Sequence, residues 1–438
     1  MSGTSSLKAS RAAPDRQALT QAASGFSLTL AIAEWGVPAM RFLSRLLCCL
    51  AATCAWSANA APFLYAWASH DDSKQGDFLA VFEANPKSAD YGKLLRTVPT
   101  GSEAGVAHHI EYEMPGGSTL FANDWGSGES FIFNIHDRAK PVLAAHFQRA
   151  GDFIFPHSFA RLQNGDVLAT FQSIGETYAP PGGLVELDNK GQLVRSASSE
   201  TPDIPTAVNW PYSLLVIPAA DRVVTTSTDM GRGKDWKSPE TRHVQIWSMK
   251  ELKLLASVPL PQAPAPYDKA HTYPAEPRLL ADGSVYVNTF SCGLYRISGL
   301  TSGKPSATFV YGFPGGGEHA MCAVPVVYGK YWIQTVGSIN GLIVLDVSDP
   351  DNPKEVSRLS LPMDFHMPHW IGADRANGRI AVTGGHDSWL AMLKFDEATG
   401  ALQLDEHFAD GGGFQFDRPQ WPDGSSGRAL VHGVVFTK

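Results

Sequence analysis

The sequence predicts an all-β protein, a β-propeller of seven four-stranded blades. Helical periodicity is nearly absent after residue 60, and short runs rich in Val, Ile, Leu, Phe and Tyr alternate with Asn-Gly, Asp-Gly or Gly-Lys turns. A similar unit recurs at intervals of about 45–65 residues. Four antiparallel strands per unit at this spacing are typical of a propeller blade. The 41 Gly and 30 Pro are scattered along the chain, which suits many short strands joined by tight turns.

The first sixty residues have a different character. Residues 1–39 show no clear periodic pattern, and we interpret them as a non-native extension upstream of the true start. Met40 opens a basic segment, an apolar run of about eleven residues and a small-residue site ending at Ala60, which predicts a signal peptide over residues 40–60. The alternative is a genuine extension with an internal anchor, although the apolar run is short for a bilayer span. We expect residues 61–438 to form one propeller domain, periplasmic or secreted, with no membrane insertion after signal cleavage.

Six full units follow one another along the mature chain. In each unit a tight turn such as Asn164-Gly165 joins the first strand to the second, as in a β-hairpin. The innermost strands are expected to begin near residues 109, 157, 212, 275, 321 and 369. Third strands are expected at 183–188, 244–248, 294–298, 341–347 and 390–395, and fourth strands follow them, as at 254–259 and 353–361.

The two ends of the mature chain are expected to build the seventh blade together. Residues 62–100 supply about half of a unit and residues 427–436 supply the rest, while residues 400–426 form a loop or a cap. Joining the N-terminal and C-terminal strands in one sheet closes the ring and leaves no open sheet edge. A ring of eight blades is the alternative.

Histidines recur at the first position of the expected inner strands. When the units are aligned on the Thr or Asn that closes each second strand, this position falls on His109, His157, Tyr212, Ala275, Met321 and His369. Equivalent positions around a ring face one axis, so the distant histidines are expected to converge. Imidazole is the commonest transition-metal ligand, and a set without thiolate or carboxylate suits copper, then zinc or iron. His108 joins its neighbour only if a β-bulge turns both side chains the same way.

Four other polar residues are secondary candidates. His319 precedes the aligned position by two residues and is expected at the rim, whereas His386 and His432 lie in second-strand context, where a supporting role is expected. Glu276 follows the aligned position by one residue, so it is either a base or water-fixing carboxylate or a solvated side chain. For any single histidine, the alternative to metal binding is a hydrogen-bonded structural role. The sequence contains no GxGxxG, P-loop, CxxC or HExxH motif.

Charge and cysteine content narrow the class of partner. Residues 1–60 hold five basic and two acidic residues, so the mature chain carries 30 basic against 41 acidic residues, a net charge of −11. This excess disfavours nucleic acid and anionic membrane surfaces, and it leaves a small molecule as the expected partner. Cys292 and Cys322 are the two cysteines after residue 60, and they either pair in an oxidising compartment or remain small core residues.

Four segments carry a resemblance to a known family. They are the His108-His109 strand start, the Pro156–Phe159 stretch PHSF, the stretch LIVLDVSDPDNPKEV over Leu342–Val356 and the stretch PHWIGADRANGRIAVT that begins at Pro368. Their order resembles the selenium-binding protein family, whose bacterial members include copper-dependent methanethiol oxidases. The likeness covers most of residues 62–410. The family's N-terminal cysteine, which is tied to selenium binding, has no counterpart in residues 62–107, and this argues against selenium binding here.

The resemblance implies a copper oxidoreductase that uses O₂. Methanethiol would be converted to formaldehyde, hydrogen sulfide and hydrogen peroxide, with His109, His157 and His369 as catalytic copper ligands and His108 as a fourth ligand. Two alternatives stay open from the residues alone. One is a non-catalytic propeller that serves as a scaffold or binding module of the cell envelope. The other is a propeller hydrolase such as a lactonase, whose divalent ion is usually held by Glu, Asn and Asp rather than by histidines.

Overall fold

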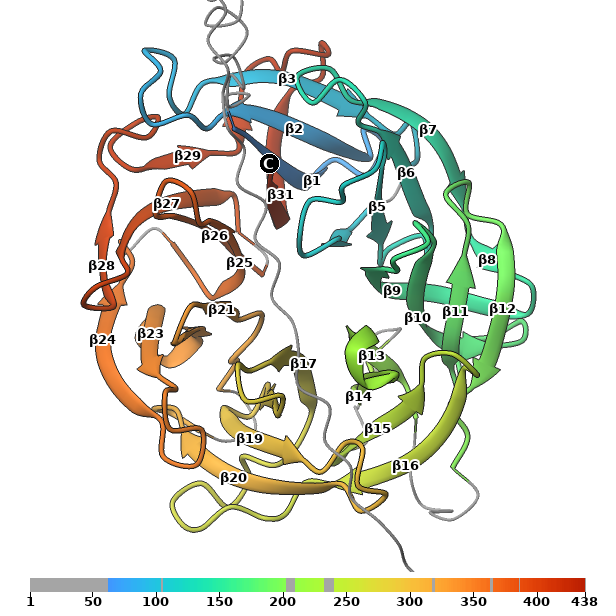
Figure 1. The fold of residues 1–438 in the computed structure, drawn as a ribbon. Coiled ribbons are helices and arrows are strands. Elements are labelled where there is room, and N and C mark those ends of the chain that lie inside the picture. Colours follow the sequence, from blue (N-terminus) through green and yellow to red (C-terminus); the bar gives the residue numbers. More distant parts are fainter. Residues whose placement is uncertain are drawn as a thin grey trace, which may run out of the picture. The chain divides into compact units, whose positions relative to one another are not determined.

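Seven antiparallel sheets surround a common axis in the part of the chain that the structure describes, as Figure 1 shows. The structure is a computed structural model that describes residues 62–437 except 104, 202–208, 232–239, 317–319, 363–364 and 386. The expected upstream extension, the signal peptide, His319 and His386 therefore lie outside the described residues. The prediction of an all-β propeller with seven blades is confirmed.

The sheets follow one another around the ring in chain order, and we number them as blades 1 to 7. Blade 1 contains β1 (Phe63–His70), β2 (Asp77–Glu83), β3 (Leu94–Pro99), β30 (Asp417–Arg418) and β31 (Gly427–Phe436). Blade 2 contains β4 (Ala107–Ile110), β5 (Thr119–Asp124), β6 (Ser130–Asn134) and β7 (Val142–Phe147). Blade 3 contains β8 (Arg149–Ala150), β9 (Phe153–Arg161), β10 (Val167–Ile174), β11 (Gly183–Leu187) and β12 (Leu193–Ser198).

The second half of the ring repeats the same plan. Blade 4 contains β13 (Pro211–Ile217), β14 (Arg222–Ser227), β15 (His243–Ser248) and β16 (Lys253–Pro259), and blade 5 contains β17 (Pro274–Leu279), β18 (Val285–Thr289), β19 (Gly293–Ser298) and β20 (Ser306–Gly312). Blade 6 contains β21 (Val326–Tyr328), β22 (Tyr331–Val336), β23 (Gly341–Asp346) and β24 (Lys354–Ser360). Blade 7 contains β25 (Pro368–Asp374), β26 (Arg379–Gly384), β27 (Trp389–Asp396), β28 (Ala401–Leu404) and β29 (Gly413–Gln415). Two short 3₁₀ turns, η1 (Pro218–Ala220) and η2 (Gly337–Ile339), connect strands of blades 4 and 6.

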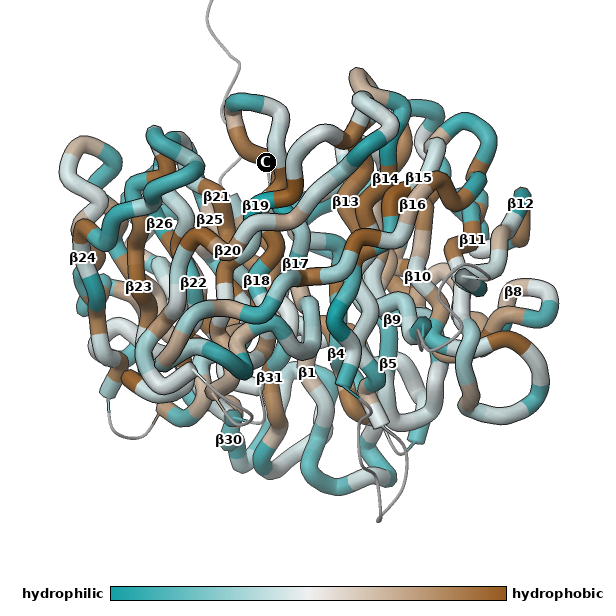
Figure 2. Tube along the Cα trace, turned by 90° about the horizontal axis from the view of Figure 1, so that it is seen from below, coloured by the Kyte–Doolittle hydropathy of each residue, from teal (hydrophilic) through white to brown (hydrophobic). Residues whose placement is uncertain are grey.

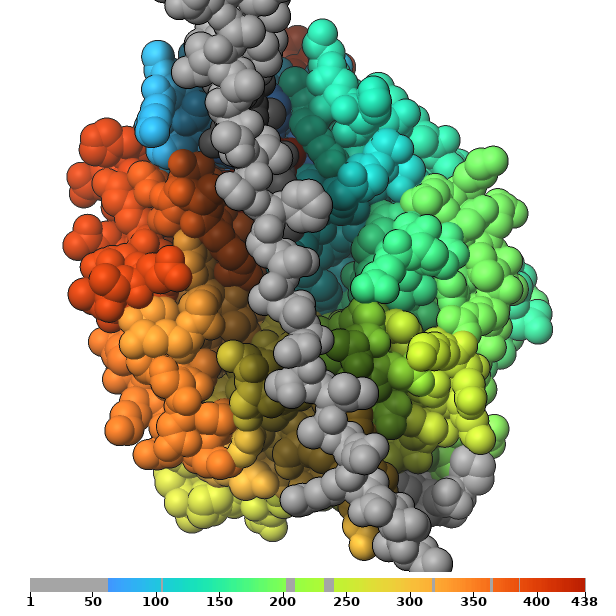
Figure 3. Space-filling model, in the orientation of Figure 1, coloured from blue at the N-terminus to red at the C-terminus, as the bar shows by residue number. Residues whose placement is uncertain are grey.

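The innermost strands form a closed circle around the axis. In order they are β31, β4, β9, β13, β17, β21 and β25, and β25 packs against β31 again. The space-filling view shows the same succession, since the colours of the sequence follow one another around the ring (Figure 3). The C-terminal β31 pairs with β1 from Leu64 to His70, so the prediction that strands near residue 62 and strands near the C-terminus complete one blade is confirmed.

Residues 400–426 are not only a loop or a cap. They contain β28, the fourth strand of blade 7, together with β29 and β30. The sequence hides these strands because they are two to four residues long and are separated by the glycine-rich segment 411–413. Within the described ranges, no helix has the length and hydropathy needed to cross a bilayer.

Large aromatic side chains fill the spaces between neighbouring blades. Trp67 of β1 and Trp370 of β25 are both fully buried. The Trp67 indole N–H donates to the Asn123 carbonyl of blade 2 at 2.8 Å, and the Trp370 indole N–H donates to the Val434 carbonyl of blade 1 at 2.9 Å. Seen from the side, hydrophobic segments follow strands such as β14 and β23, while hydrophilic segments gather in connecting loops (Figure 2). This core holds the inner strands, and therefore the axial side chains, in fixed positions.

A disulfide joins Cys292 of blade 5 to Cys322, which precedes β21 of blade 6. The two Cα atoms are 5.0 Å apart, which is within the usual range for a bridged pair. Both cysteines are fully buried. The pairing that the sequence left open is therefore present, and it ties two neighbouring blades together next to their inner strands.

Removal of this disulfide is expected to lower the free energy of unfolding by about 3–4 kcal/mol, because the bond closes a loop across a sequence separation of 30 residues. Urea unfolding of the double variant Cys292→Ala/Cys322→Ala, compared with the oxidised wild type, measures the change. An unchanged unfolding midpoint would show that the bond adds nothing to the stability of the ring.

Candidate metal centre

A Thr or Asn side chain on the second strand of most blades links two neighbouring inner strands. Thr170 shows the pattern, since its Oγ1 accepts the Ser158 N–H at 3.0 Å and donates to the Tyr212 carbonyl of the next blade at 2.8 Å. Equivalent bonds end on the carbonyls of Ala275, Cys322, His369 and His432. In blades 4 to 6 the residue whose carbonyl receives this bond also precedes the residue whose N–H donates to its own second strand, and we call this place the axial position. The receiving carbonyls of His369 and His432 mark it in blades 7 and 1. In blade 3 the Asn123 amide reaches the Pro156 carbonyl instead, and the axial residue is the one before Ser158.

The hydrogen bonds correct the alignment made from the sequence at two blades. The Asn123 side chain accepts the His109 N–H at 2.7 Å, just as Thr170 accepts the Ser158 N–H, so His108 rather than His109 is equivalent to His157. In blade 6 the axial residue is Cys322 rather than Met321. The error has a simple cause. The accepting side chain lies 14 residues after the donating N–H in blade 2 but 12 residues after it in blade 3, so no single spacing fits both hairpins.

His432 also has a different place from the one expected. It lies on β31, the innermost strand of blade 1, and its carbonyl accepts a hydrogen bond from the Thr383 hydroxyl. The expectation of second-strand context was wrong because blade 1 is split between the two ends of the described chain. Its inner strand therefore appears in the sequence without the hairpin that follows it in other blades.

A β-bulge places His108 and His109 on the same side of the inner strand. The pairing of β4 with β5 shifts register between Ala107 and Ile110, and the two imidazole centroids are 4.6 Å apart. The structure therefore contains the bulge that His108 and His109 need in order to bind the same metal ion. Comparable shifts occur where β9, β13, β17 and β25 pair with their second strands. Each of these five blades can thus direct two successive side chains towards the axis.

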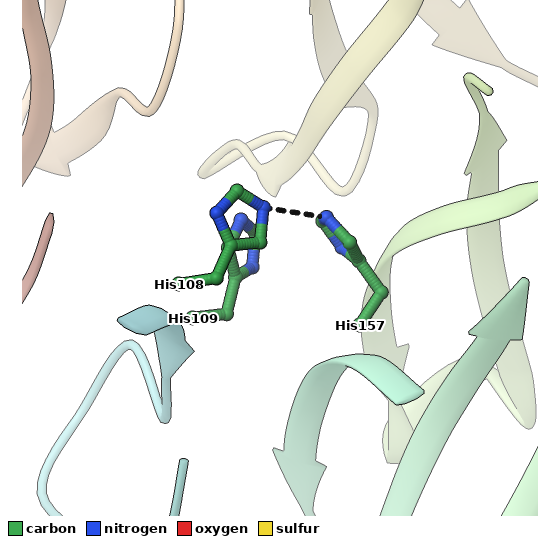
Figure 4. Close-up of side chains that lie close together, drawn as sticks. All are labelled: His108, His109 and His157. Atoms are coloured by element: carbon green, nitrogen blue, oxygen red, sulfur yellow. Dashed lines mark hydrogen bonds between the residues drawn. The ribbon is translucent and has the colours of Figure 1, made fainter. Parts of the chain in front are cut away.

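His108, His109 and His157 form a group that is suited to hold a metal ion. Each offers a ring nitrogen that lies within 4.8 Å of the other two, and all three residues are buried. Figure 4 shows a ring nitrogen of His108 directed at a ring nitrogen of His157. The two Nε2 atoms are 2.9 Å apart, which is within hydrogen-bond distance. Two imidazoles bound to one ion at about 2.0–2.1 Å place their nitrogens roughly 3–4 Å apart, so the spacing is close to that of a ligand pair.

The protein keeps these imidazoles neutral. Burial, and then the neighbouring histidines, hold the pKa values of His108 and His109 well below the ordinary value. Burial lowers the pKa of His157 to about 3, although its hydrogen bond to the Tyr212 carbonyl acts in the opposite direction. Because a carbonyl only accepts, His157 Nδ1 carries the hydrogen at 2.7 Å and Nε2 presents its lone pair towards His108. A metal ligand needs this neutral form with a free lone pair.

His369 and His432 extend the cluster to five imidazoles. The His432 ring lies 4.3 Å from that of His108 and 4.4 Å from that of His369, measured between centroids. His369 is thus brought to the axis as expected, but next to His432 and outside the tight group of three. Both residues are at axial positions and are buried.

Glu276 lies close to the histidines but takes no part in their group. It is fully buried, so the expectation of a solvated side chain is excluded. Its carboxylate accepts hydrogen bonds from Tyr112, Ser213 and Arg278 at 2.7–2.9 Å. Burial raises its pKa, whereas the Arg278 charge and the hydroxyl donors oppose that rise. Tyr112 lies outside the axial positions, so alignment of the repeats could not have identified it as a neighbour of the site.

Aromatic side chains border the histidines. The Trp125 ring lies 6.2 Å from His108 and 6.0 Å from His157, and the Phe290 ring stacks against His369 at 6.4 Å, all between centroids. Trp125 also contacts Tyr178 at 5.8 Å. Trp125, Phe290 and Tyr178 are each only partly buried. The side chains next to the histidines on this side are therefore mainly aromatic.

Acid is expected to destabilise the metal-free protein through His157. The unfolded imidazole binds a proton below about pH 6.5, whereas the folded one does so only near pH 3, so stability falls as the pH drops through this window. Between pH 7 and pH 5 the loss is about 2 kcal/mol. Urea unfolding of the wild type and of His157→Asn at both pH values measures it, because the variant lacks this contribution. Equal pH dependence of the two proteins would contradict the assignment.

Comparison with known proteins gives one similar sequence and several similar folds. No protein-family model matches the chain. A methanethiol oxidase from Hyphomicrobium sp. is 28% identical over 204 residues, which is 43% of this chain and 46% of that protein. The aligned part thus spans less than half the length of this curated relative.

Solved structures with the same architecture include proteins of different activities. A hypothetical selenium-binding protein from Sulfolobus tokodaii superposes with a TM-score of 0.66 at 15% identity and covers 86% of this chain and 94% of its own. A periplasmic gluconolactonase from Pseudomonas aeruginosa superposes with a TM-score of 0.60 at 15% identity, over 86% of this chain and 99% of its own. At such identities these two structures establish the fold alone. This divergent chain is therefore similar in sequence to a methanethiol oxidase and in fold to a selenium-binding protein, as the resemblance predicted.

Proposed function

We propose that this protein is an exported copper-dependent oxidoreductase that oxidises a small thiol or related sulfur compound with O₂. The observation that carries the proposal is the buried, neutral group of His108, His109 and His157, in a chain whose sequence is similar to a methanethiol oxidase. The similarity supplies the reaction class, and the three imidazoles supply the place where it would occur.

The donor set fits copper better than the hard cations. Imidazole nitrogen suits copper, zinc and iron, whereas Mg²⁺ and Ca²⁺ prefer oxygen ligands. Among divalent first-row ions, copper binds most tightly to a given nitrogen site. His108, His109 and His157 would hold the ion, and His432 or His369 lies close enough to the group to supply a further ligand after a small movement.

The reaction implied by the similarity is the oxidation of methanethiol. Methanethiol, O₂ and one water yield formaldehyde, hydrogen sulfide and hydrogen peroxide, so the carbon is oxidised and O₂ is reduced. A bound copper ion supplies the electron transfer and favours the thiolate form of the substrate. The chain contributes neutral imidazoles that need not lose protons before they bind the ion, and a low-dielectric surrounding that excludes bulk water.

The surface beside the histidines favours a small and largely apolar substrate. Trp125 and Phe290 present aromatic rings next to His157 and His369, and apolar contacts of this kind bind a short alkyl group without specific hydrogen bonds. A charged substrate would lose its hydration there without gaining an opposite charge, since the nearby Glu276 and Arg278 already pair with each other at 2.9 Å.

An oxidising compartment is part of the proposal. The signal sequence expected over residues 40–60 directs the chain out of the cytoplasm. The Cys292–Cys322 disulfide supports this address, because structural disulfides persist in the periplasm and outside the cell.

A lactonase is the second candidate, favoured by the similar fold of the gluconolactonase. Its chemistry usually requires a divalent ion among oxygen ligands. Among the described residues, the group suited to a metal consists of histidines, and Glu276 already accepts three hydrogen bonds. We therefore rank the lactonase, and the non-catalytic scaffold, below the oxidase.

Oxygen consumption by the purified copper-loaded protein tests the proposal. With methanethiol as substrate, O₂ uptake should be matched by formaldehyde, sulfide and peroxide in equal amounts, and the metal-free protein should be inactive. Hydrolysis of gluconolactone serves as the comparison assay. Copper binding without thiol oxidation would contradict the proposed reaction. Bound copper below about 0.2 equivalents per chain after loading would favour the non-catalytic scaffold.

A further inference from the structure

A polar layer lies directly beside His109 and is built from five blades. It consists of Tyr112, Ser158, Ser213, Glu276 and Arg278, with Trp370 against one ring. Ser158, Ser213 and Glu276 follow the axial residues of blades 3, 4 and 5, so they are equivalent to His109 in blade 2. None of these side chains is needed to complete a metal-binding group. Their arrangement nevertheless fixes the direction of every hydrogen bond between Glu276 and His109.

The direction starts at the carboxylate. Glu276 forms an ion pair with Arg278, and an ionised carboxylate can only accept hydrogen bonds. The Tyr112 hydroxyl is 2.8 Å from its Oε1, and the Ser213 hydroxyl is 2.7 Å from its Oε2. Each hydroxyl has one hydrogen, and both hydrogens therefore point to Glu276.

Towards His109, the Tyr112 oxygen can then only accept. It lies 3.3 Å from Ser158 Oγ and 3.2 Å from His109 Nδ1. Ser158 Oγ lies 2.8 Å from His109 Nδ1, and the hydrogen of His157 Nδ1 is directed to the Tyr212 carbonyl. The arrangement with the fewest lone pairs facing each other runs from His109 Nδ1–H to Ser158, from Ser158 to Tyr112, and from Tyr112 to Glu276. It leaves one such contact, between the Tyr112 and Ser213 oxygens at 3.1 Å, because both hydroxyls donate to the carboxylate.

This direction determines which nitrogen of His109 is free. With the hydrogen on Nδ1, the Nε2 lone pair is left for a metal ion. A metal-bound histidine usually donates its other N–H to a carboxylate, a carbonyl or water, and this partner fixes the tautomer and raises the basicity of the ligand. Here two hydroxyl groups lie between the histidine and the carboxylate. Each group still donates its hydrogen towards Glu276, so the carboxylate can act on His109 through them.

The Tyr112 ring is held tightly enough to serve as the link. It stacks on Trp370 with 4.8 Å between centroids and an interplanar angle of 6°, and the Arg278 guanidinium lies 4.3 Å from its centroid. Arg278 therefore contacts the carboxylate and the first hydroxyl-bearing residue of the connection, since it pairs with Glu276 and packs on Tyr112. Aromatic stacking and cation–π contact restrict the ring to one orientation.

We propose that Glu276 is a positioning residue for the metal centre, which acts through the Tyr112 and Ser158 hydroxyls to hold His109 in the tautomer with a free Nε2. The proposal rests on His109 being a metal ligand, as in the proposed function. It assigns no contact between Glu276 and the metal or the substrate. The matched control in the layer is Ser213, which also donates to Glu276 and lies 3.1 Å from the Tyr112 oxygen, but supplies no hydrogen to the bonds that run from His109 to Tyr112.

The test reads the His109 tautomer directly. Imidazole ¹⁵N shifts of the metal-free protein, assigned with a His109→Gln variant, should show Nδ1 protonated in the wild type and in Ser213→Ala. In Glu276→Gln and Tyr112→Phe the tautomer should be mixed or reversed, because a carboxamide can donate as well as accept and phenylalanine breaks the connection.

Zn²⁺ affinity gives the second readout, and Zn²⁺ alone is the ligand used. Glu276→Gln and Tyr112→Phe should each weaken binding about 10- to 100-fold, the usual effect of losing an outer-shell partner, and the double variant should lose no more than either one. Ser213→Ala should change affinity less than about threefold. Thermal unfolding of each variant checks that the fold persists, and Tyr112→Phe decides the matter should Glu276→Gln fail to fold.

Two outcomes would overturn the proposal. One is an unchanged His109 tautomer in both Glu276→Gln and Tyr112→Phe, and the other is an equal loss of affinity in Ser213→Ala, which would indicate general damage to the layer. If the wild type binds no metal ion, the proposed function fails. The ¹⁵N measurement on the metal-free protein still decides whether Glu276 sets the tautomer.

Discussion

Replacement of His157 by alanine is expected to abolish stable copper binding. His157 is fully buried, its Nε2 faces that of His108 at 2.9 Å, and its tautomer is fixed by the Tyr212 carbonyl. Its removal leaves two imidazoles of the tight group, so the loss of affinity should exceed the roughly 10- to 100-fold effect of losing an outer-shell partner. Copper content after loading and dialysis should fall from about one equivalent per chain to less than 0.1.

The control for this experiment is His146→Ala. His146 lies on β7, its side chain is 61% exposed, and it pairs with Glu129 away from the axis. Its replacement should leave copper binding unchanged. Because His157→Ala also opens a cavity, His157→Gln is measured beside it with thermal unfolding. Full copper occupancy in both His157 variants would contradict the assignment of His157 as a ligand.

Removal of β31 is expected to prevent folding. A chain that stops at residue 426 loses the inner strand of blade 1, and the edge of β1 from Leu64 to His70 becomes unpaired. Buried backbone groups without partners are costly, and an exposed strand edge promotes aggregation. The same truncation removes Val431 and Val434, which are at most 1% exposed. We expect no soluble monomer and no near-ultraviolet circular dichroism signal.

The control for the truncation is Arg428→Ala, a change on the same strand. Its side chain is 47% exposed and forms an ion pair with Asp71 at 3.1 Å. Exposed pairs contribute about 0–1 kcal/mol, so the variant should fold normally. A truncated chain that remained a folded monomer with the melting temperature of the wild type would show that closure by β31 is dispensable.

The fold was predictable because the repeat is visible without any long-range information. Hairpins such as the one at Asn164-Gly165 set strand length and turn type locally, and the number of units then defines the ring. Closure by β31 was also predictable, since an incomplete first unit requires a partner at the other end. The short strands β28 to β30 were missed because two to four residues carry too little alternation to be distinguished from a loop.

The site was predictable in part. Convergence of His109, His157 and His369 on the axis follows from the ring. The bulge that brings His108 beside His109 was a condition that the sequence left open, and the structure contains it. Exact register could not be read from the sequence, because the hairpins of blades 2 and 3 differ in length.

The positions of two residues near the site, His432 and Tyr112, could not be predicted from the repeats. His432 lies on a strand that is separated from its own blade by the whole chain, so its equivalence was hidden. Tyr112 reaches Glu276 across the axis over a separation of 164 residues, and no local pattern predicts such a contact. In both cases the missing information is three-dimensional.

The most direct test of the central claim is the position of copper in the loaded protein, measured by anomalous diffraction or X-ray absorption. We predict one copper ion bound by ring nitrogens of His108, His109 and His157 at about 2.0–2.1 Å. Copper bound elsewhere, or ligated mainly by oxygen, would contradict the claim that the closed ring gathers these three imidazoles into a metal centre.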